Sequence, residues 1–321
     1  MKYYIALDGG GSKVNAILFD ENLKPVKFAK TGSMNHKFSS EELLNQNAME
    51  LAHSLMDDTG ITEVECAFGV FTRTISDAIG KVINLKSIDD RGGEGLIGLL
   101  SAFVFGDAII SLSGTGSVVF YNSGDKGYEA GGWGSIIHDW GSGYDMARMA
   151  WNECIRQVES RGPKTLITDC ICKKLGVENL WEASDRIYNY PGKAPISALA
   201  STAVCVGEAA RMGDEIAQRL LKECGEKMAE QTIGLIHRDK APSEVPIVLE
   251  GGHWKNDMRM VRAFCDAIHK DDPQRQVVIP YFEPVVGAVL VLPYINGETL
   301  TEQKKAELKE WYKDYKLVIK E

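Results

Sequence analysis

The sequence YIALDGGGSKVNAILF, residues 4–19, decides the fold. An apolar run at 3–7 predicts one β-strand, and a second run with β-branched residues at 14–19 predicts another. The polar and glycine residues 8–13 lie between them. Because the second strand begins directly after Lys13, the pattern predicts a glycine-turned β-hairpin. It matches neither a GxxxxGK[ST] loop nor the GxGxxG loop of dinucleotide-binding folds, since both of those lead into a helix.

The turn at residues 8–13 has the composition of a phosphate-binding turn. Glycine lets the backbone come close to a phosphate group, and successive N–H groups in such a turn form an anion-binding concavity. Asp8, at the end of the first strand, is placed to hold a magnesium ion through water. Phosphate contacts are expected from the rest of the turn, namely Gly10, Gly11, Ser12 and Lys13. The alternative is an ordinary hairpin turn, although three consecutive glycines exceed what a hairpin needs.

A second glycine turn, Ser-Gly-Thr-Gly-Ser at residues 113–117, lies between apolar runs at 107–112 and 118–121. These runs predict two more strands. Small hydroxyl groups and glycines suit phosphate oxygens, and the candidates are Gly114, Thr115, Gly116 and Ser117. Taken alone, a tight turn explains this motif equally well. Together, the two motifs predict two phosphate-binding hairpins that face each other.

The glycine-rich stretch GGWGSIIHDWGSG, residues 131–143, predicts a sugar-binding loop. Tryptophan rings pack on the C–H faces of sugars, and a carboxylate accepts hydrogen bonds from sugar hydroxyl groups. The alternative is a structural loop anchored by its tryptophans. Further along, a strand at 247–249 leads to Gly251 and Gly252, whose bare backbone would let an adenine ring lie close. A simple strand-to-helix turn is the alternative there.

Alternating strands and helices along the rest of the chain predict an α/β architecture. Residues 146–237 are expected to be largely helical, and one helix is expected to begin at Ser39, which forms a capping-box pattern with Glu42. Further strands are expected at 25–30, 65–71 and 277–279, and further helices at 75–83, 95–104, 258–268, 287–292 and 301–315. The glycine clusters at strand ends predict one cleft to which several loops contribute.

Length, charge and cysteine content narrow the classes of function. A chain of 321 residues predicts two domains. Its net charge of −9 and pI near 5.3 disfavour a nucleic-acid partner, because an acidic surface repels phosphates. No apolar run approaches the roughly 20 residues of a membrane span, and the first residues lack a signal-peptide pattern. The seven cysteines form no CxxC pair, which is typical of reduced thiols in a cytoplasmic protein.

The motif order DGGGSK, MNHK, SGTGS, GGWGxxxxDxGSG and LEGG resembles the BadF-type ATPase and N-acetylglucosamine kinase family of the actin/hexokinase superfamily. The resemblance covers essentially the whole chain, including PVVGAVLVL at residues 284–292. It implies an α/β fold with two actin-like, ribonuclease H-like domains that flank a nucleotide cleft. The first domain would comprise residues 1–117, completed by a C-terminal helix at about 290–321, and the second residues 118–289. The resemblance also implies ATP with Mg²⁺ and a homodimer.

By this resemblance, residues 8–13 and 114–117 grip the nucleotide phosphates, and Gly251 and Gly252 lie near the adenosine. The implied sugar site is lined by Asn35, His36, Gly132, Trp133, His138 and Asp139. The chain departs from the family in two places. The family reads Gly-Asp-Glu-Gly-Ser where this chain has residues 138–142, His-Asp-Trp-Gly-Ser. The family's catalytic aspartate opens a helix about twenty residues before the GTGS turn; Glu94 stands in that register here, and Asp90 is the nearest aspartate.

We therefore expect an ATP-dependent kinase that phosphorylates a hydroxyl group of an amino sugar, with N-acetylglucosamine as the first candidate and Glu94 or Asp90 as the base. N-acetylmuramic acid and glucosamine are alternative acceptors, and His138 would meet the anionic lactyl group of the former. An ATPase activator of the BadF type is an alternative of another class; it carries an iron–sulfur ligand cysteine where Ser111, Leu112 and Ser113 stand here. A sugar-sensing repressor is disfavoured because no helix–turn–helix precedes Tyr3.

Overall fold

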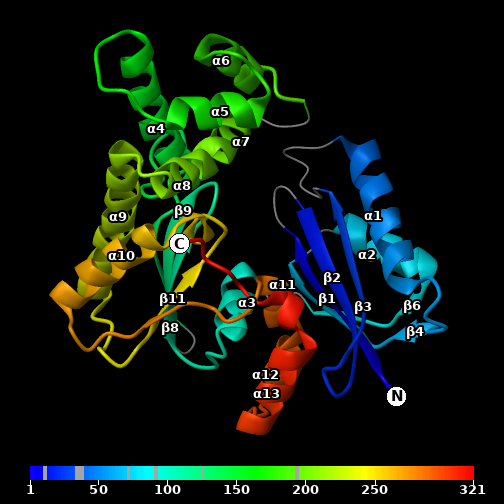
Figure 1. The fold of residues 1–321 in the computed structure, drawn as a ribbon. Helices are drawn as coiled ribbons and strands as arrows, with labels where there is room; N and C mark the ends of the chain where they lie inside the picture. The colour runs from blue at the N-terminus through cyan, green and yellow to red at the C-terminus, as the bar shows by residue number, and fades with distance from the viewer. Residues whose placement is uncertain (10–12, 33–39, 71–72, 90–92, 124–125, 192–194) are drawn as a thin grey trace. The chain divides into compact units, whose positions relative to one another are not determined.

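The computed structural model describes residues 1–9, 13–32, 40–70, 73–89, 93–123, 126–191 and 195–321. The chain forms two compact units, which Figure 1 shows as ribbons. The first comprises Met1–Phe105 and Pro280–Leu317, and the second Gly106–Ile279 and Val318–Glu321. Each unit is built on a five-stranded sheet. No helix in the described part of the chain combines the length and the apolar character needed to cross a membrane.

The sheet of the first unit has the strand order β3-β2-β1-β5-β7. Its strands are β1 (Tyr3–Gly9), β2 (Lys13–Asp20), β3 (Pro25–Gly32), β5 (Cys66–Val70) and β7 (Ile88–Asp89). β1, β2 and β3 form an antiparallel meander, whereas β5 runs parallel to β1, and β7 runs parallel to β5. Gly9 lies opposite Val14, so the predicted hairpin is confirmed. A separate two-stranded sheet joins β4 (Glu63–Val64) and β6 (Asn84–Leu85).

Both faces of this sheet are covered, which explains why β1 and β2 are apolar almost throughout. Successive side chains of a strand point to opposite faces. Ile5 and Leu7 pack with α1 (Glu41–Met56) and α2 (Arg73–Val82), whereas Ala6 packs on the other face. The helices of that other face are α3 (Glu94–Ser101), α11 (Pro284–Val289), α12 (Val291–Ile295) and α13 (Glu302–Trp311).

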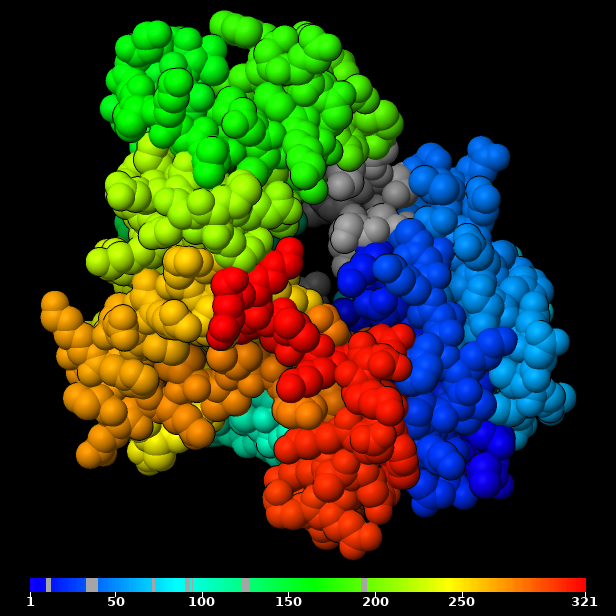
Figure 2. All heavy atoms as spheres, viewed as in Figure 1, coloured from blue at the N-terminus to red at the C-terminus, as the bar shows by residue number. Residues whose placement is uncertain are grey.

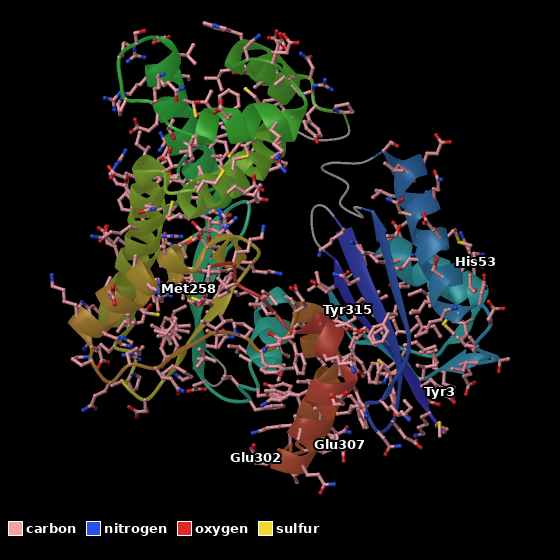
Figure 3. All side chains as sticks on the ribbon, in the orientation of Figure 1. Tyr3, His53, Met258, Glu302, Glu307 and Tyr315 are labelled. Atoms are coloured by element: carbon pink, nitrogen blue, oxygen red, sulfur yellow. The ribbon has the colours of Figure 1, made fainter. Side chains whose placement is uncertain are left out.

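The C-terminal segment completes the first unit. Figure 2 shows the red C-terminal helices beside the blue N-terminal strands. The hydroxyl of Tyr312 donates to the carbonyl of Leu23 over 2.8 Å, and the ring of Tyr315, labelled in Figure 3, stacks on Phe28 with centroids 4.9 Å apart. Residues far apart in the sequence therefore share one core.

The sheet of the second unit repeats the arrangement of the first, with the order β10-β9-β8-β11-β12. Its strands are β8 (Ala108–Ser113), β9 (Ser117–Ser123), β10 (Lys126–Gly131), β11 (Ile247–Glu250) and β12 (Val277–Val278). β8, β9 and β10 form an antiparallel meander, and β11 and β12 run parallel to β8. The β8–β9 turn thus occupies the same topological place as the β1–β2 turn, and these are the two glycine turns.

Seven helices of the described second unit pack in one apolar core with this sheet. They are α4 (Gly143–Val158), α5 (Ile167–Leu175), α6 (Leu180–Tyr188), α7 (Pro195–Ala200), α8 (Val204–Arg211), α9 (Glu215–Asp239) and α10 (Met258–Asp271). Asp214 caps α9 by accepting the N–H of Ala217 over 2.7 Å. The long helix α9 matters for the site, because it supplies side chains on which a glycine loop rests.

The structure differs from the sequence-based expectations in several details. The predicted boundary between residues 117 and 118 falls inside the β8–β9 hairpin, and both strands belong to the second unit because they pair with each other. Strand β10 was not predicted. The N-cap of α1 is Ser40, which accepts the N–H of Leu43, instead of Ser39. The single helix expected at 287–292 is divided into α11 and α12.

Two glycines of α9 lead to opposite predictions. A Cβ at Gly225 would lie 2.2 Å from the carbonyl oxygen of Met260 on α10, whereas a Cβ at Gly234 would have nothing within 4 Å. We expect Gly225→Ala to destabilise the protein by about 1–3 kcal/mol through overpacking against backbone. Gly234→Ala should stabilise it by roughly 0.5–1 kcal/mol, because alanine loses less entropy in a helix. Urea unfolding measures both; equal effects of the two changes would contradict this packing of α9 on α10.

Candidate active site

Asp8 lies at the end of β1, directly before the glycine turn. It pairs with Asn15 on β2 and with Val70 on β5. Lys13 opens β2 and is exposed, whereas Gly10, Gly11 and Ser12 lie outside the described residues. A magnesium ion takes one or two carboxylates together with phosphate oxygens and water, so the single carboxylate of Asp8 fits it. Among the described residues, no group of three or more His, Cys, Asp or Glu is placed to hold a metal.

The other candidates of the first unit cannot be placed in full. Glu94 is the first residue of α3, as expected, and Gly93 is the N-cap. The side chain of Glu94 lies outside the described part of the chain, as do Asn35, His36 and Asp90. The assignment of a base and of these two sugar contacts stays a prediction.

The second glycine turn is joined to the N-terminus of α4. The strands β8 and β9 pair as far as Ser113 and Ser117, and the N–H of Gly114 donates to the carbonyl of Gly116 over 2.8 Å. The N–H of Gly143 donates to Gly114 over 2.8 Å, and that of Tyr144 to the carbonyl of Thr115 over 3.1 Å. The positive end of the α4 dipole therefore points at this turn and favours an anion there.

Two buried serine hydroxyls fasten the glycine-rich loop 131–143 to the same turn. The hydroxyl of Ser113 donates to the carbonyl of Gly141 over 2.8 Å, and that of Ser117 to Trp140 over 2.7 Å. The N–H of Gly132 donates to the carbonyl of Ser117 over 3.1 Å. Loop and turn form one hydrogen-bonded assembly, and the hydroxyl of Ser117, a predicted phosphate contact, is used inside it.

Asp139 closes the tip of the loop on itself. Its carboxylate accepts the N–H of Gly134 over 3.0 Å and the hydroxyl of Ser135 over 3.2 Å. A Cβ at Gly116 would lie 2.6 Å from Oδ2 of Asp139, so the carboxylate rests directly on the turn 113–117. A carboxylate has about four lone-pair sites. Asp139, which is 5% exposed, uses two of these sites to organise the loop.

The loop presents apolar side chains to solvent. Trp133 is 74% exposed, and Ile136 and Ile137 are also exposed. The ring of His138 contacts Trp140 edge-on, with centroids 4.9 Å apart. An exposed cluster of this kind marks a binding surface more often than a structural one. The predicted residues Gly132, Trp133, His138 and Asp139 thus lie on one short loop beside the turn 113–117.

Gly251 and Gly252 also reach this turn. A Cβ at Gly251 would lie 2.3 Å from the carbonyl oxygen of Ser113, and φ is +103°, so the position requires glycine. Gly252 is exposed, and nothing lies within 4 Å of a Cβ built on it. The N–H of His253 donates to the carbonyl of Ser113 over 2.9 Å. Gly251 is thus packed against the turn, and Gly252 leaves open backbone beside it, where the adenosine contact is predicted.

Sequence reasoning missed His253 and Asp145. His253 is buried, and its Nε2 has no hydrogen-bond partner among the described residues. Burial lowers the pKa of His253 from 6.5 to about 4. Asp145 is 1% exposed and accepts the N–H of Gly141 over 3.1 Å. The spacing Ser142-x-x-Asp145 is a capping-box pattern that could have revealed it, and Ser142 does accept the N–H of Asp145.

The model of one protein family, described as the BadF/BadG/BcrA/BcrD ATPase family, matches residues 5–291. An N-acetylmuramic acid/N-acetylglucosamine kinase from Clostridium acetobutylicum is 25% identical over 304 residues, which cover 91% of this chain and 98% of the relative. An N-acetyl-D-glucosamine kinase from Dictyostelium discoideum is 23% identical over 320 residues, which cover 90% of this chain and 97% of that one.

Two solved structures share the fold. A Chromobacterium violaceum protein that has been proposed to be an N-acetylglucosamine kinase has a TM-score of 0.66 at 23% identity, with 91% of this chain and 99% of that chain covered. A ROK family glucokinase from Streptomyces griseus, in complex with glucose and AMPPNP, has a TM-score of 0.56 at 15% identity, with 89% and 97% covered. The expected actin-like α/β fold is confirmed by these similarities.

The buried His253 predicts a pH dependence of stability. Its pKa of about 4 in the folded protein lies below the 6.5 of the unfolded chain, so the unfolded chain binds more protons between these values. Stability attributable to His253 is therefore lost as the pH falls through this window, by about 2 kcal/mol between pH 7 and pH 5. Urea unfolding at both pH values should show this loss in the wild type and much less of it in His253→Gln.

His53→Gln is the matched control, since His53 is an exposed histidine of the first unit paired with Asp57. This control should lose stability on acidification as the wild type does. An equal loss in the wild type and in His253→Gln would contradict the burial of a neutral imidazole.

Proposed function

Because the chain belongs to the BadF/BadG/BcrA/BcrD ATPase family, we propose that it is an ATP-dependent kinase that phosphorylates a hydroxyl group of an amino sugar. The observation that carries the proposal is the assembly of turn 113–117, loop 131–143 and Gly251, in which a glycine turn of a composition suited to phosphate adjoins an exposed tryptophan loop. N-acetylglucosamine is the proposed acceptor, since the two relatives described above carry that sugar in their names.

The phosphate side of the reaction rests on backbone groups. The turn of residues 114–117 and the N-terminus of α4 would favour the nucleotide's negative charge, together with Lys13. Asp8 would hold Mg²⁺, which when bound neutralises charge on the transferred phosphoryl group. Gly251, packed on Ser113, would place Gly252, whose open backbone would leave room for the adenosine. Such fixed donors contribute most of the charge stabilisation expected in phosphoryl transfer.

The acceptor side rests on the loop. The exposed ring of Trp133 offers a flat apolar face for the sugar, and Asp139 and His138 offer polar atoms beside it. We propose that Asn35, His36 and Gly132 complete the sugar site. Glu94, at the start of α3, would orient the acceptor hydroxyl and take its proton, with Asp90 as the alternative base.

N-acetylmuramic acid is the second acceptor that we propose, because His138 would meet its anionic lactyl group; glucosamine is a third. An ATPase activator with an iron–sulfur cluster is less well supported. Ser111 and Ser113 stand where its ligand cysteine would lie, both are fully buried, and the hydroxyl of Ser113 already donates to Gly141. A homodimer and a cytoplasmic location complete the proposal.

Incubation of the protein with MgATP and a panel of sugars tests this function. Coupled ADP release and mass spectrometry of the product should show transfer of one phosphoryl group to N-acetylglucosamine. Asp8→Ala should abolish transfer without unfolding the protein, whereas Asp77→Ala, which changes an exposed aspartate on α2, should not affect it. Phosphoryl transfer by Asp8→Ala at near wild-type kcat would remove Asp8 from the site, and no transfer by the wild type to any sugar would refute the function.

The base is tested by two amide variants. Glu94→Gln should remove most of kcat with little change in either KM, because a poor hydroxyl nucleophile needs a carboxylate within hydrogen-bond reach. Asp90→Asn should stay active. The reverse pattern in steady-state kinetics would make Asp90 the base, and normal activity of both variants would exclude either carboxylate from proton transfer.

A further inference from the structure

An ion pair beneath the glycine loop joins the first turn of α4 to the middle of α9. Nζ of Lys227 lies 3.2 Å from Oδ2 of Asp145, 82 residues away in the sequence. Asp145 is 1% exposed and Lys227 21% exposed. Neither residue belongs to a motif that the sequence singled out, and the proposed chemistry uses neither.

Three hydrogen-bond donors surround the Asp145 carboxylate. It accepts hydrogen bonds from Lys227, from the N–H of Gly141 over 3.1 Å and from Nη2 of Arg148 over 3.0 Å. Burial alone would raise the pKa of Asp145, but these three donors together lower it, so the group stays ionised. Burial likewise opposes the charge of Lys227, whereas Asp145 and Glu223 raise its pKa.

Stability alone gives little reason for such a pair. A buried ion pair often contributes no more to the stability of a protein than a well-packed apolar pair of similar volume. Buried charges of this kind can instead specify one arrangement of the groups around them. The arrangement specified here is that of Gly141, whose N–H lies on the Asp145 carboxylate.

Gly141 is held on three sides. Its N–H donates to Asp145, and its carbonyl accepts the hydroxyl of Ser113 from the phosphate turn. A Cβ at Gly141 would lie 2.5 Å from Cγ of Met228 and 2.8 Å from the carbonyl oxygen of Cys224, both on α9. The left-handed φ of +68° also favours glycine at this position. Helix α9 thus sets the position of Gly141, the residue at which the loop 131–143 contacts the turn 113–117.

We propose that Asp145 and Lys227 are positioning residues for phosphoryl transfer. They hold Gly141 so that the loop 131–143 keeps its position against the turn 113–117. The inference rests on the proposed kinase function. Loss of the pair would let the segment 139–143 shift relative to residues 113–117. A displacement on the order of 1 Å in a reacting complex can lower the rate about 10²-fold.

The test compares Lys227→Met with Lys227→Arg in the full-length protein, using the sugar that the wild type phosphorylates. Lys222→Met is the matched control, because Lys222 lies on the same helix in an exposed pair with Glu226. We expect Lys227→Met to lower kcat/KM for the sugar about 10- to 100-fold, with kcat reduced, while KM for ATP changes less than threefold. Lys227→Arg should restore most of the loss, and Lys222→Met should match the wild type.

The double change Asp145→Leu with Lys227→Met keeps the test valid if the single variant unfolds. An apolar pair leaves no unpaired buried charge, so the double variant should fold and still show the lowered kcat/KM for the sugar. A folded double variant with wild-type kcat and KM values for the sugar would overturn the proposal, as would a Lys227→Met enzyme with a lowered Tm but unchanged kinetics. A wild type that phosphorylates no sugar would instead refute the proposed function itself.

Discussion

Buried backbone polar groups must find hydrogen-bond partners, and this constraint shapes the glycine-rich part of the second unit. The turn 113–117 and the loop 131–143 contain many glycines, which have no side chain to supply a hydrogen-bond partner for the backbone. Their N–H and C=O groups pair with each other, with the N-terminus of α4 and with the hydroxyls of Ser113 and Ser117. Each segment is therefore the other's support, and the site depends on both being in place.

The repeated sheet topology explains where such turns occur. In both units an antiparallel hairpin begins the sheet, and its turn carries the glycine motif, after β1 in one and after β8 in the other. A parallel strand, β5 or β11, then pairs with the first strand. In the second unit β11 ends next to the turn, and this brings Gly251 against Ser113. The fold thus gathers three separate glycine segments at one end of one sheet.

Local patterns were enough to predict the hairpins, most helices and the loop that carries Trp133 and Asp139. Runs of apolar residues and glycine turns are short-range signals, and they state little about which partner a side chain will find. Asp139 and Ser117 form hydrogen bonds inside the protein only because the loop folds back on the turn. The Asp145–Lys227 pair joins residues 82 positions apart, which no periodicity reveals. Strand β10 escaped prediction because it has only two apolar residues, Tyr128 and Ala130, and Gly127 and Gly131 flank them.

Amide hydrogen exchange of the ligand-free protein tests the central claim most directly, namely that turn, loop and the α4 N-terminus are assembled before any ligand binds. The informative amides are those of Gly134, Gly141, Gly143 and Tyr144, each of which donates to a partner in the assembly. The account predicts that all four exchange slowly and at similar rates, as one cooperative unit. Fast exchange at these amides, comparable with that of an open surface loop, would contradict it.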